Sequence, residues 1–279
     1  MLSQAMNYRH AYHAGNFADV HKHAALILLL AHLRKKETPF HVIDSHAGIG
    51  RYDLAGIEAG KTGEAESGIL RVKDCKDEIL APYLALVRGE NGGGVLRFYP
   101  GSPLVIRRLL RPTDRLSLAE LHPEDARSLR QLFHHDRQVA IREEDAYQAL
   151  KALLPPKERR GLALIDPPFE EKDEFQRLAK GLAEALRRWA SGIYAIWYPI
   201  KSLSDCQRFK SELVNFGRPC LISEVMLLSG SDETRLMGSG LAVINPPWQL
   251  DRQLESLAKV LHRALGCQGQ TATEWLVSG

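Results

Sequence analysis

The turn Asp-Pro-Pro-Phe at residues 166–169 combines residue types that can activate an aromatic amine. It follows the apolar segment 162–165, so we expect it at the carboxyl edge of a parallel sheet, where ligands bind. The lone pair of such an amine is delocalised, and the Asp166 carboxylate and Pro167 carbonyl can accept its two hydrogens and make it more nucleophilic. The prolines hold φ at about −65° and Phe169 offers a face for stacking a base. We therefore predict that Asp166, Pro167 and Phe169 are catalytic.

A second turn with the same pattern, Asn-Pro-Pro-Trp at residues 245–248, follows another apolar segment. Either turn can serve simply to end its strand, because proline cannot continue a hydrogen-bonded ladder. Counted along the chain, the strand before Asp166 is the fourth and should lie beside the first, whereas the strand before Asn245 is the last and should lie at the far edge. We therefore predict that Asp166 is the chemical site and that Asn245 ends a strand.

Residues 44–50, Asp-Ser-His-Ala-Gly-Ile-Gly, follow the first expected strand and predict a cofactor site around Gly48. Glycine lets the backbone turn tightly and approach a ligand closely. Ala47 stands where a dinucleotide fingerprint would have its first glycine, and an insertion displaces the helix that would receive a pyrophosphate. The loop therefore favours a cofactor without phosphates, which suits S-adenosylmethionine.

Two acidic residues, Glu120 and Asp145, follow the next two expected strands. Glu120 is placed where a carboxylate can accept the hydroxyls of a ribose, as in dinucleotide folds. Asp145 can bind the adenine of the cofactor, but the sequence equally allows it to be a helix cap or a surface acid. The order of a glycine loop and two acids on three successive strands supports a nucleoside-like cofactor.

The N-terminal segment is rich in aromatic, basic and histidine side chains. Tyr8 can stack on a base, and Arg9 and Lys22 can contact phosphates, so we predict that this segment meets RNA or DNA. A packed N-terminal segment is nearly as good an interpretation. A metal site is disfavoured because its histidines lack a nearby cysteine or a helical pair with an acidic partner; they are His10, His13, His21 and His23.

Short apolar runs alternate with helical segments along the chain, which is typical of an open α/β sheet with helices on both faces. The expected strands centre on 40–43, 116–118, 139–141, 162–165, 193–196, 221–227 and 241–244, and the expected helices are 18–33, 125–133, 145–154, 173–190 and 202–216. Some seventy residues separate the first two strands, far more than a crossover needs. We therefore predict one domain from 1–52 and 99–279, with a small helical insertion at 53–98.

Composition gives broader bounds. The 279 residues carry a net charge of only +3, with basic clusters that are typical of solvated faces or helix ends. The four cysteines lack metal or redox spacing, which fits a reducing cytoplasm. The longest apolar run is far too short to span a bilayer, and the start does not read as a secretion signal, so we expect a soluble protein.

Taken in order, these motifs resemble the bacterial 23S rRNA adenine-N6 methyltransferases of the RlmJ type. The resemblance covers nearly the whole chain and includes Tyr8-Arg9-His10, His13-Ala14-Gly15-Asn16, Lys22-His23, His46-Ala47-Gly48, Tyr99-Pro100-Gly101-Ser102-Pro103, Glu120-Leu121-His122-Pro123, Asp166-Pro167-Pro168, Trp197-Tyr198-Pro199 and Asn245-Pro246-Pro247-Trp248. Phe169 departs from the tyrosine that members of this family can carry, and the start is a few residues longer.

The resemblance implies a Rossmann-like methyltransferase with a helical insertion. By the same resemblance, the protein acts as a monomer and without a metal, and its substrate is an adenine of 23S rRNA that is free of protein or in early assembly. The resemblance also implies that Asp166 is the acid-base residue, that Tyr8 contacts the RNA, and that the cofactor is bound by His23, His46, Ser102, Glu120, Asp145, Ala146 and Asp166. Two alternatives stay open: a DNA adenine methyltransferase, and a non-enzymatic RNA-binding protein that retains the cofactor fold.

Overall fold

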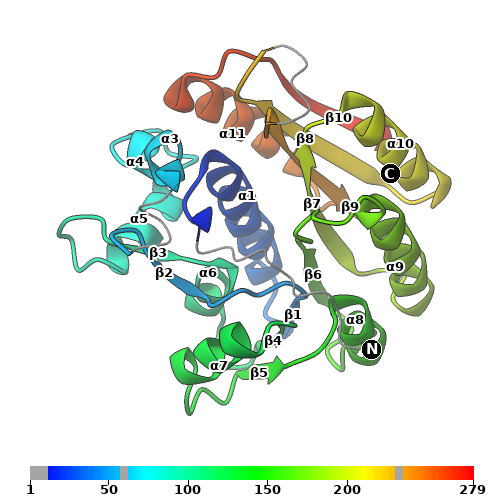
Figure 1. The fold of residues 1–279 in the computed structure, drawn as a ribbon. Coiled ribbons are helices and arrows are strands. Elements are labelled where there is room, and N and C mark those ends of the chain that lie inside the picture. The colour runs from blue at the N-terminus through cyan, green and yellow to red at the C-terminus, as the bar shows by residue number, and fades with distance from the viewer. Residues whose placement is uncertain (1–11, 57–61, 230–234) are drawn as a thin grey trace.

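The computed structural model describes residues 12–56, 62–229 and 235–279. Over these ranges the chain forms an eight-stranded sheet in the order β10-β8-β9-β7-β6-β1-β4-β5, which runs through the middle of Figure 1. Its strands are β1 (His41–Asp44), β4 (Arg115–Ala119), β5 (Val139–Arg142), β6 (Gly161–Ile165), β7 (Ile193–Ile200), β8 (Cys220–Met226), β9 (Gly238–Ile244) and β10 (Thr271–Val277).

The five strands β5, β4, β1, β6 and β7 run parallel, and β1 lies between β4 and β6. Every residue of β6 is buried, as expected for a strand covered by helices on both faces. Asp44 at the end of β1 is in register with Leu118 of β4 and Leu164 of β6. The predicted α/β fold is therefore confirmed, and so is the position of the fourth predicted strand beside the first.

Strand β9 contradicts one prediction. It does not lie at the far edge but between β7 and β8, antiparallel to both, with Ile244 opposite Tyr194. The prediction failed because chain order does not reveal that β8 and β9 fold back as an antiparallel pair and that β9 inserts beside β7. The end of β9, and hence Asn245, lies at the start of β7, at the opposite edge of the sheet from Asp166.

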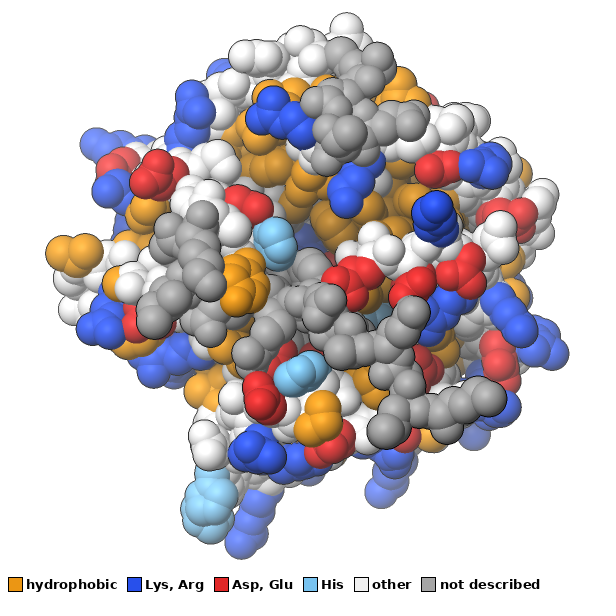
Figure 2. All heavy atoms as spheres, viewed as in Figure 1, with side chains coloured by type: hydrophobic (Ala, Val, Ile, Leu, Met, Phe, Trp, Pro, Cys, Tyr) orange, Lys and Arg blue, Asp and Glu red, His pale blue; other side chains and the backbone are white. Residues whose placement is uncertain are grey.

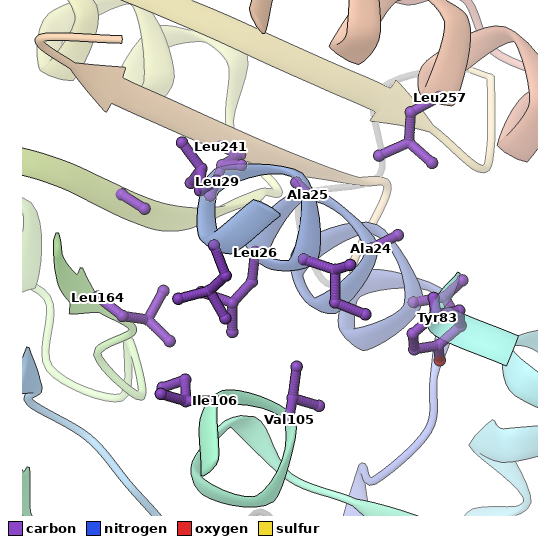
Figure 3. Close-up of a cluster of buried hydrophobic side chains, with 14 of the residues drawn as sticks. Ala24, Ala25, Leu26, Leu29, Tyr83, Val105, Ile106, Leu164, Leu241 and Leu257 are labelled. Carbon is purple, nitrogen blue, oxygen red and sulfur yellow. The ribbon is translucent and has the colours of Figure 1, made fainter. Parts of the chain in front are cut away.

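Two helical layers cover the sheet (Figure 1). One layer contains α1 (Phe17–Arg34), α6 (Ser102–Leu109), α7 (Pro123–Leu132) and α11 (Leu250–Leu265), and the other contains α8 (Ala146–Leu153), α9 (Glu174–Arg188) and α10 (Leu203–Asn215). Figure 3 shows the core of the first layer, where Leu26 of α1 faces Leu164 of β6 and Ile106 of α6. The sequence analysis did not predict α11 or β10.

The predicted insertion contains α3 (Glu64–Ser67), α4 (Ile69–Val72) and α5 (Ala81–Gly89). The short strands β2 (Arg51–Asp53) and β3 (Phe98–Pro100) pair with each other across its two ends. Its apolar side chains, among them Ile69 and Tyr83, belong to the same buried cluster as α1. The division at 53–98 stays a prediction, but the helices inside it share the core of the rest of the chain.

None of the helices in the described ranges has the length and apolar character needed to cross a membrane.

Candidate active site

A cavity of about 670 Å³ opens at the carboxyl edge of the parallel strands. This volume lies within the range of small-molecule and cofactor sites. The cavity brings together all eight residues predicted to bind a cofactor: His23, His46, Gly48, Ser102, Glu120, Asp145, Ala146 and Asp166. They come from α1, the loop after β1, the start of α6, the ends of β4 and β6, and the start of α8, so only the folded chain makes them neighbours.

The turn at Asp166 contacts the glycine loop directly. The backbone N–H of Asp166 donates to Nδ1 of His46 at 3.3 Å, and the hydroxyl oxygen of Ser45 lies 2.9 Å from the same nitrogen and 3.0 Å from the carbonyl oxygen of Leu164. Burial lowers the pKa of His46 to about 4, so its ring is neutral near neutral pH and can accept this hydrogen bond. The pairing of β1 with β6 and this contact together fix the turn beside the loop.

Lys22 is placed differently from the exposed phosphate contact that the sequence suggested. It is 4% exposed, its ammonium lies 3.0 Å from Oδ1 of Asp19, and it donates to Oδ2 of Asp166. Burial opposes its charge, but the carboxylates of Asp166 and Asp19 outweigh burial and raise the pKa of Lys22 above its ordinary value. The structure thus gives Lys22 an internal partner, the predicted catalytic carboxylate.

Glu120 follows the neighbouring strand β4 and is hydrogen-bonded to the glycine loop. Its Oε2 accepts the N–H of Gly48 at 2.8 Å and its Oε1 accepts the N–H of His122 at 2.8 Å. Gly48 has a φ of +63°, and a side chain there would place its Cβ 2.3 Å from the hydroxyl of Tyr52. Burial raises the pKa of Glu120. The conformation and the close approach both require glycine at this position.

Asp145 serves as a cap and also lines the cavity. Its Oδ1 accepts the N–H groups of Tyr147 and Gln148, at 3.0 and 3.1 Å, at the start of α8. Its Oδ2 lies 3.8 Å from Nη2 of Arg177. The two interpretations that the sequence left open are therefore compatible, because one oxygen caps the helix while the residue stays in the cavity wall together with Ala146.

Asp44 is a residue of this region that the sequence analysis did not single out. It is fully buried, its carboxylate is hydrogen-bonded to Ser102, and its Oδ2 has no hydrogen-bond partner among the described residues. Burial raises the pKa of Asp44 to about 7. Its position as the last residue of β1, at the carboxyl edge of the sheet, is the sequence signal that could have identified it.

The other two predicted catalytic residues support the turn from outside the cavity wall. Phe169 has a φ of +52°, and its ring lies 4.8 Å from that of Phe175 and 5.9 Å from that of Trp197. Pro167 is buried, and Pro168 is the proline of the turn that lines the cavity. The stacking role of Phe169 stays a prediction, since in this structure its ring packs on other aromatic side chains.

Tyr8 and Arg9, which were predicted to contact RNA, lie outside the described residues. Within the described ranges, no group of three or more His, Cys, Asp and Glu side chains is arranged to hold a metal ion. Of the three predicted RNA contacts, Lys22 is the one that lies within the described residues, and its surroundings are acidic.

The cavity wall is strongly acidic. Among the described residues of the wall, Lys22 and Arg177 carry a permanent positive charge, against seven carboxylates: Glu120, Asp125, Asp145, Asp166, Glu170, Glu171 and Glu174. Acidic side chains also gather near the middle of the face shown in Figure 2. Such a wall attracts a cationic ligand and repels a pyrophosphate.

The chain is similar over nearly its whole length to known proteins. A family model described as "Ribosomal RNA large subunit methyltransferase D, RlmJ" matches residues 37–277. The protein "Ribosomal RNA large subunit methyltransferase J" of Escherichia coli (strain K12) is 43% identical over 277 residues, which cover 98% of this chain and 99% of that protein. The protein of the same name from Haemophilus influenzae is also 43% identical, over 97% of this chain and 99% of that protein.

A crystal structure of a protein from Legionella pneumophila has the same fold. It is 32% identical to this chain and superimposes with a TM-score of 0.86 over 94% of this chain and 97% of that one.

Proposed function

The chain belongs to the ribosomal RNA large subunit methyltransferase family described as RlmJ, and from this premise we propose that it methylates the exocyclic N6 amine of an adenine in 23S rRNA, with S-adenosylmethionine as the methyl donor. The observation that carries the proposal is the contact between the Asp166 turn and the glycine loop at the edge of one cavity. This contact supports the proposal because it joins the Asp166 turn to the loop that is expected to bind the cofactor.

The residues present fit this cofactor. S-adenosylmethionine carries a positively charged sulfonium and an ammonium but no phosphate, which agrees with a cavity in which carboxylates outnumber cations. The unpaired Oδ2 of Asp44 beneath the loop adds a buried acceptor to the same region. The residues that would hold the cofactor are His23, His46, Gly48, Ser102, Glu120, Asp145, Ala146 and Asp166.

The cofactor supplies an electrophilic methyl group, and the protein makes the acceptor amine reactive. We assign to the Asp166 carboxylate and the Pro167 carbonyl the acceptance of the two N6 hydrogens, which concentrates the lone pair on nitrogen and directs it. Because both prolines fix their backbone and Lys22 holds one oxygen of Asp166, these acceptors are set before the base arrives. Little reorganisation is then needed during the transfer.

The target adenine must leave its stack to reach the cavity. Phe169 would stack on the extracted base, and Tyr8 and Arg9 would contact the RNA around it. Lys22 would act on the substrate through Asp166 and not through phosphates, since its ammonium is buried between two carboxylates. This division separates chemistry at the sheet edge from RNA binding by the N-terminal segment.

We further propose a cytoplasmic monomer that acts on 23S rRNA free of protein or early in assembly. The four cysteines, Cys75, Cys206, Cys220 and Cys267, are all free thiols, as expected for a reducing compartment.

Transfer of label from tritiated S-adenosylmethionine tests the proposal. Protein-free 23S rRNA, duplex DNA and single-stranded DNA are incubated separately with the enzyme and digested to nucleosides. Label in N6-methyladenosine from the RNA supports the assignment. Label in cytidine, or in DNA in preference to RNA, contradicts it, and no transfer to any substrate favours a binding protein that only retains the fold.

A further inference from the structure

The two described cations of the cavity wall are both paired with carboxylates. Lys22 is buried between two of them. The guanidinium of Arg177 lies 3.4 Å from a carboxylate oxygen of Glu174 and 3.8 Å from one of Asp145. A nucleotide that brings its adenine to Asp166 also brings a phosphate group, which the acidic wall repels. This phosphate group is therefore best met by a cation that lies outside the wall.

Strand β7 leads from the Asp166 turn to such a cation. The end of β6 is in register with Ile196 of β7, so Trp197 lies beside Asp166. Strand β7 continues past the end of β6 to Ile200, about 10 Å beyond Trp197 at the usual rise of a strand, and Lys201 follows directly. An adenosine nucleotide spans a distance of this order between its exocyclic amine and its phosphate.

Trp197 and Lys201 lie on the side of the sheet that α1 covers. The ammonium of Lys22, in α1, lies 5.9 Å from the ring centroid of Trp197. A hydrogen bond with Glu64 raises the pKa of His13, and the nearby charge of Lys201 opposes this rise. In the sequence, His13 precedes α1 and comes soon after the residues that were predicted to contact RNA. The end of β7 therefore lies on the side from which RNA is expected to approach.

The ammonium of Lys201 is available to a ligand. Lys201 is exposed, and its side chain makes no ion pair or hydrogen bond with the described residues. Its backbone is held in place, because the N–H of Met237 donates to the carbonyl of the preceding residue, Ile200, at 2.9 Å, and Ile200 is buried. Lysine binds phosphate as a point charge, so Lys201 can make this contact without losing an internal partner.

We propose that Lys201 binds the phosphate group of the target nucleotide, so that the adenine enters beside the Asp166 turn with its backbone on the β7 side. This inference rests on the proposed function for the identity of the substrate. It accounts for the entry of a nucleotide into an acidic cavity, because the base lies among the carboxylates while the phosphate stays outside them. It also adds a contact from the sheet to those expected from the N-terminal segment.

Binding of a nucleoside and of its nucleotide tests this contact without turnover. The protein is saturated with S-adenosylhomocysteine and titrated with adenosine or with adenosine 5′-monophosphate, and chemical-shift changes in its NMR spectra give the affinities. The unmodified protein should bind the nucleotide about two- to tenfold more tightly than the nucleoside, the range of one hydrogen-bonded contact. Lys201→Met should bind both equally, and Lys201→Arg should keep the preference.

Lys157→Met is the matched control. Lys157 is also exposed and makes no ion pair or hydrogen bond with the described residues, but it precedes β6 and so lies at the opposite edge of the sheet. This variant has the same change in charge and should keep the preference for the nucleotide. In methyl transfer to 23S rRNA, Lys201→Met should raise KM more than it lowers kcat, and it should reduce the salt dependence of KM by about one phosphate contact.

The possible results separate this inference from the proposed function. A preference for the nucleotide that persists in Lys201→Met, or that Lys157→Met loses equally, would overturn the inference alone. Equal affinities of the unmodified protein for adenosine and its monophosphate would overturn it as well. If the unmodified protein binds neither compound and methylates no RNA, the proposed function fails and the inference fails with it.

Discussion

The two Pro-Pro turns of this chain have the same pattern and opposite positions. The turn at Asp166 follows a parallel strand and meets the glycine loop and the cavity. The turn at Asn245 follows the antiparallel strand β9 and lies at the other edge of the sheet. Strand direction therefore decides which copy of the pattern can reach a cofactor.

The side-chain contacts of the two turns also differ. The Asn245 amide donates to the carbonyls of Ala190 and Gly192, at 3.0 and 2.7 Å, and so ties β9 to the start of β7. The Asp166 carboxylate instead pairs with a buried ammonium. The Asn245 turn is therefore neutral and links two strands, whereas the Asp166 turn holds a charge at the candidate ligand site.

The sharpest way to break the comparison is to exchange the two polar side chains. Asp166→Asn should lower kcat by about 10²–10⁴-fold, because an amide is a weaker acceptor for the N6 hydrogens. Asn245→Asp should leave kcat unchanged but reduce stability by about 1–3 kcal/mol, because a carboxylate would face two carbonyls. Methyl transfer and urea unfolding of both variants measure this. Near-normal turnover of Asp166→Asn would refute the chemical role.

Removing the buried ammonium of Lys22 should impair the site around Asp166 and leave the Asn245 turn unaffected. Lys22→Met removes the buried cation that the carboxylates of Asp19 and Asp166 share, so we expect a loss of about 3–5 kcal/mol in stability together with a large loss of turnover. Lys210→Met is the control, because it breaks an ion pair with Glu224 far from the cavity. Denaturant titration and initial rates should separate the two variants, and equal rates in both would contradict the account.

The dependence of stability on pH should show whether Asp44, at the carboxyl edge of the sheet, titrates near neutral pH. The pKa of Asp44 rises from 3.8 to about 7 on folding, so between these values the folded chain holds a proton that the unfolded chain has lost. The contribution of Asp44 to the free energy of unfolding should therefore fall as pH rises from about 4 to about 7, by on the order of a few kcal/mol.

The Asp44→Asn variant should flatten this slope, whereas Asp74→Asn, which changes an exposed carboxylate, should not. Chemical unfolding at several pH values gives the comparison. A slope that is the same in Asp44→Asn and in the unmodified protein would show that the buried carboxylate does not titrate in this range.

The aromatic residues of the two turns should give the smallest contrast. Phe169→Ala removes a ring packed on Phe175 and Trp197 and should lower kcat, while Phe169→Tyr should remain close to the unmodified protein. Trp248 is 80% exposed, so Trp248→Ala should change stability by less than about 0.5 kcal/mol and leave rates unchanged. Steady-state kinetics on RNA measure these effects, and a rate loss in Trp248→Ala would bring the second turn into the substrate path.

Much of this site could be predicted because parallel strands impose its geometry. Each predicted cofactor residue follows a strand or begins a helix at the carboxyl edge, or lies in α1 behind that edge, and the fold makes these positions neighbours. The position of β6 beside β1 followed from the usual order of such sheets. In this part of the chain, the local sequence pattern and the sheet topology predict the same positions.

The remaining features depend on contacts that no local pattern encodes. The pairing of Lys22 with Asp166 joins residues 144 positions apart. The insertion of β9 between β7 and β8 depends on how the last strands pair. Helix α11 did carry a signal, since Leu250, Leu254, Leu257 and Leu261 recur at helical spacing and are buried.

The central claim is that the Asp166 turn presents an adenine amine to the methyl donor. A crystal structure with S-adenosylhomocysteine and adenosine 5′-monophosphate tests it directly. We expect the adenine N6 within hydrogen-bond distance of an Asp166 carboxylate oxygen and the Pro167 carbonyl, and on the side of the cofactor sulfur. An adenine bound with N6 turned away from Asp166, or a cofactor bound outside the cavity beside Gly48, would contradict the account.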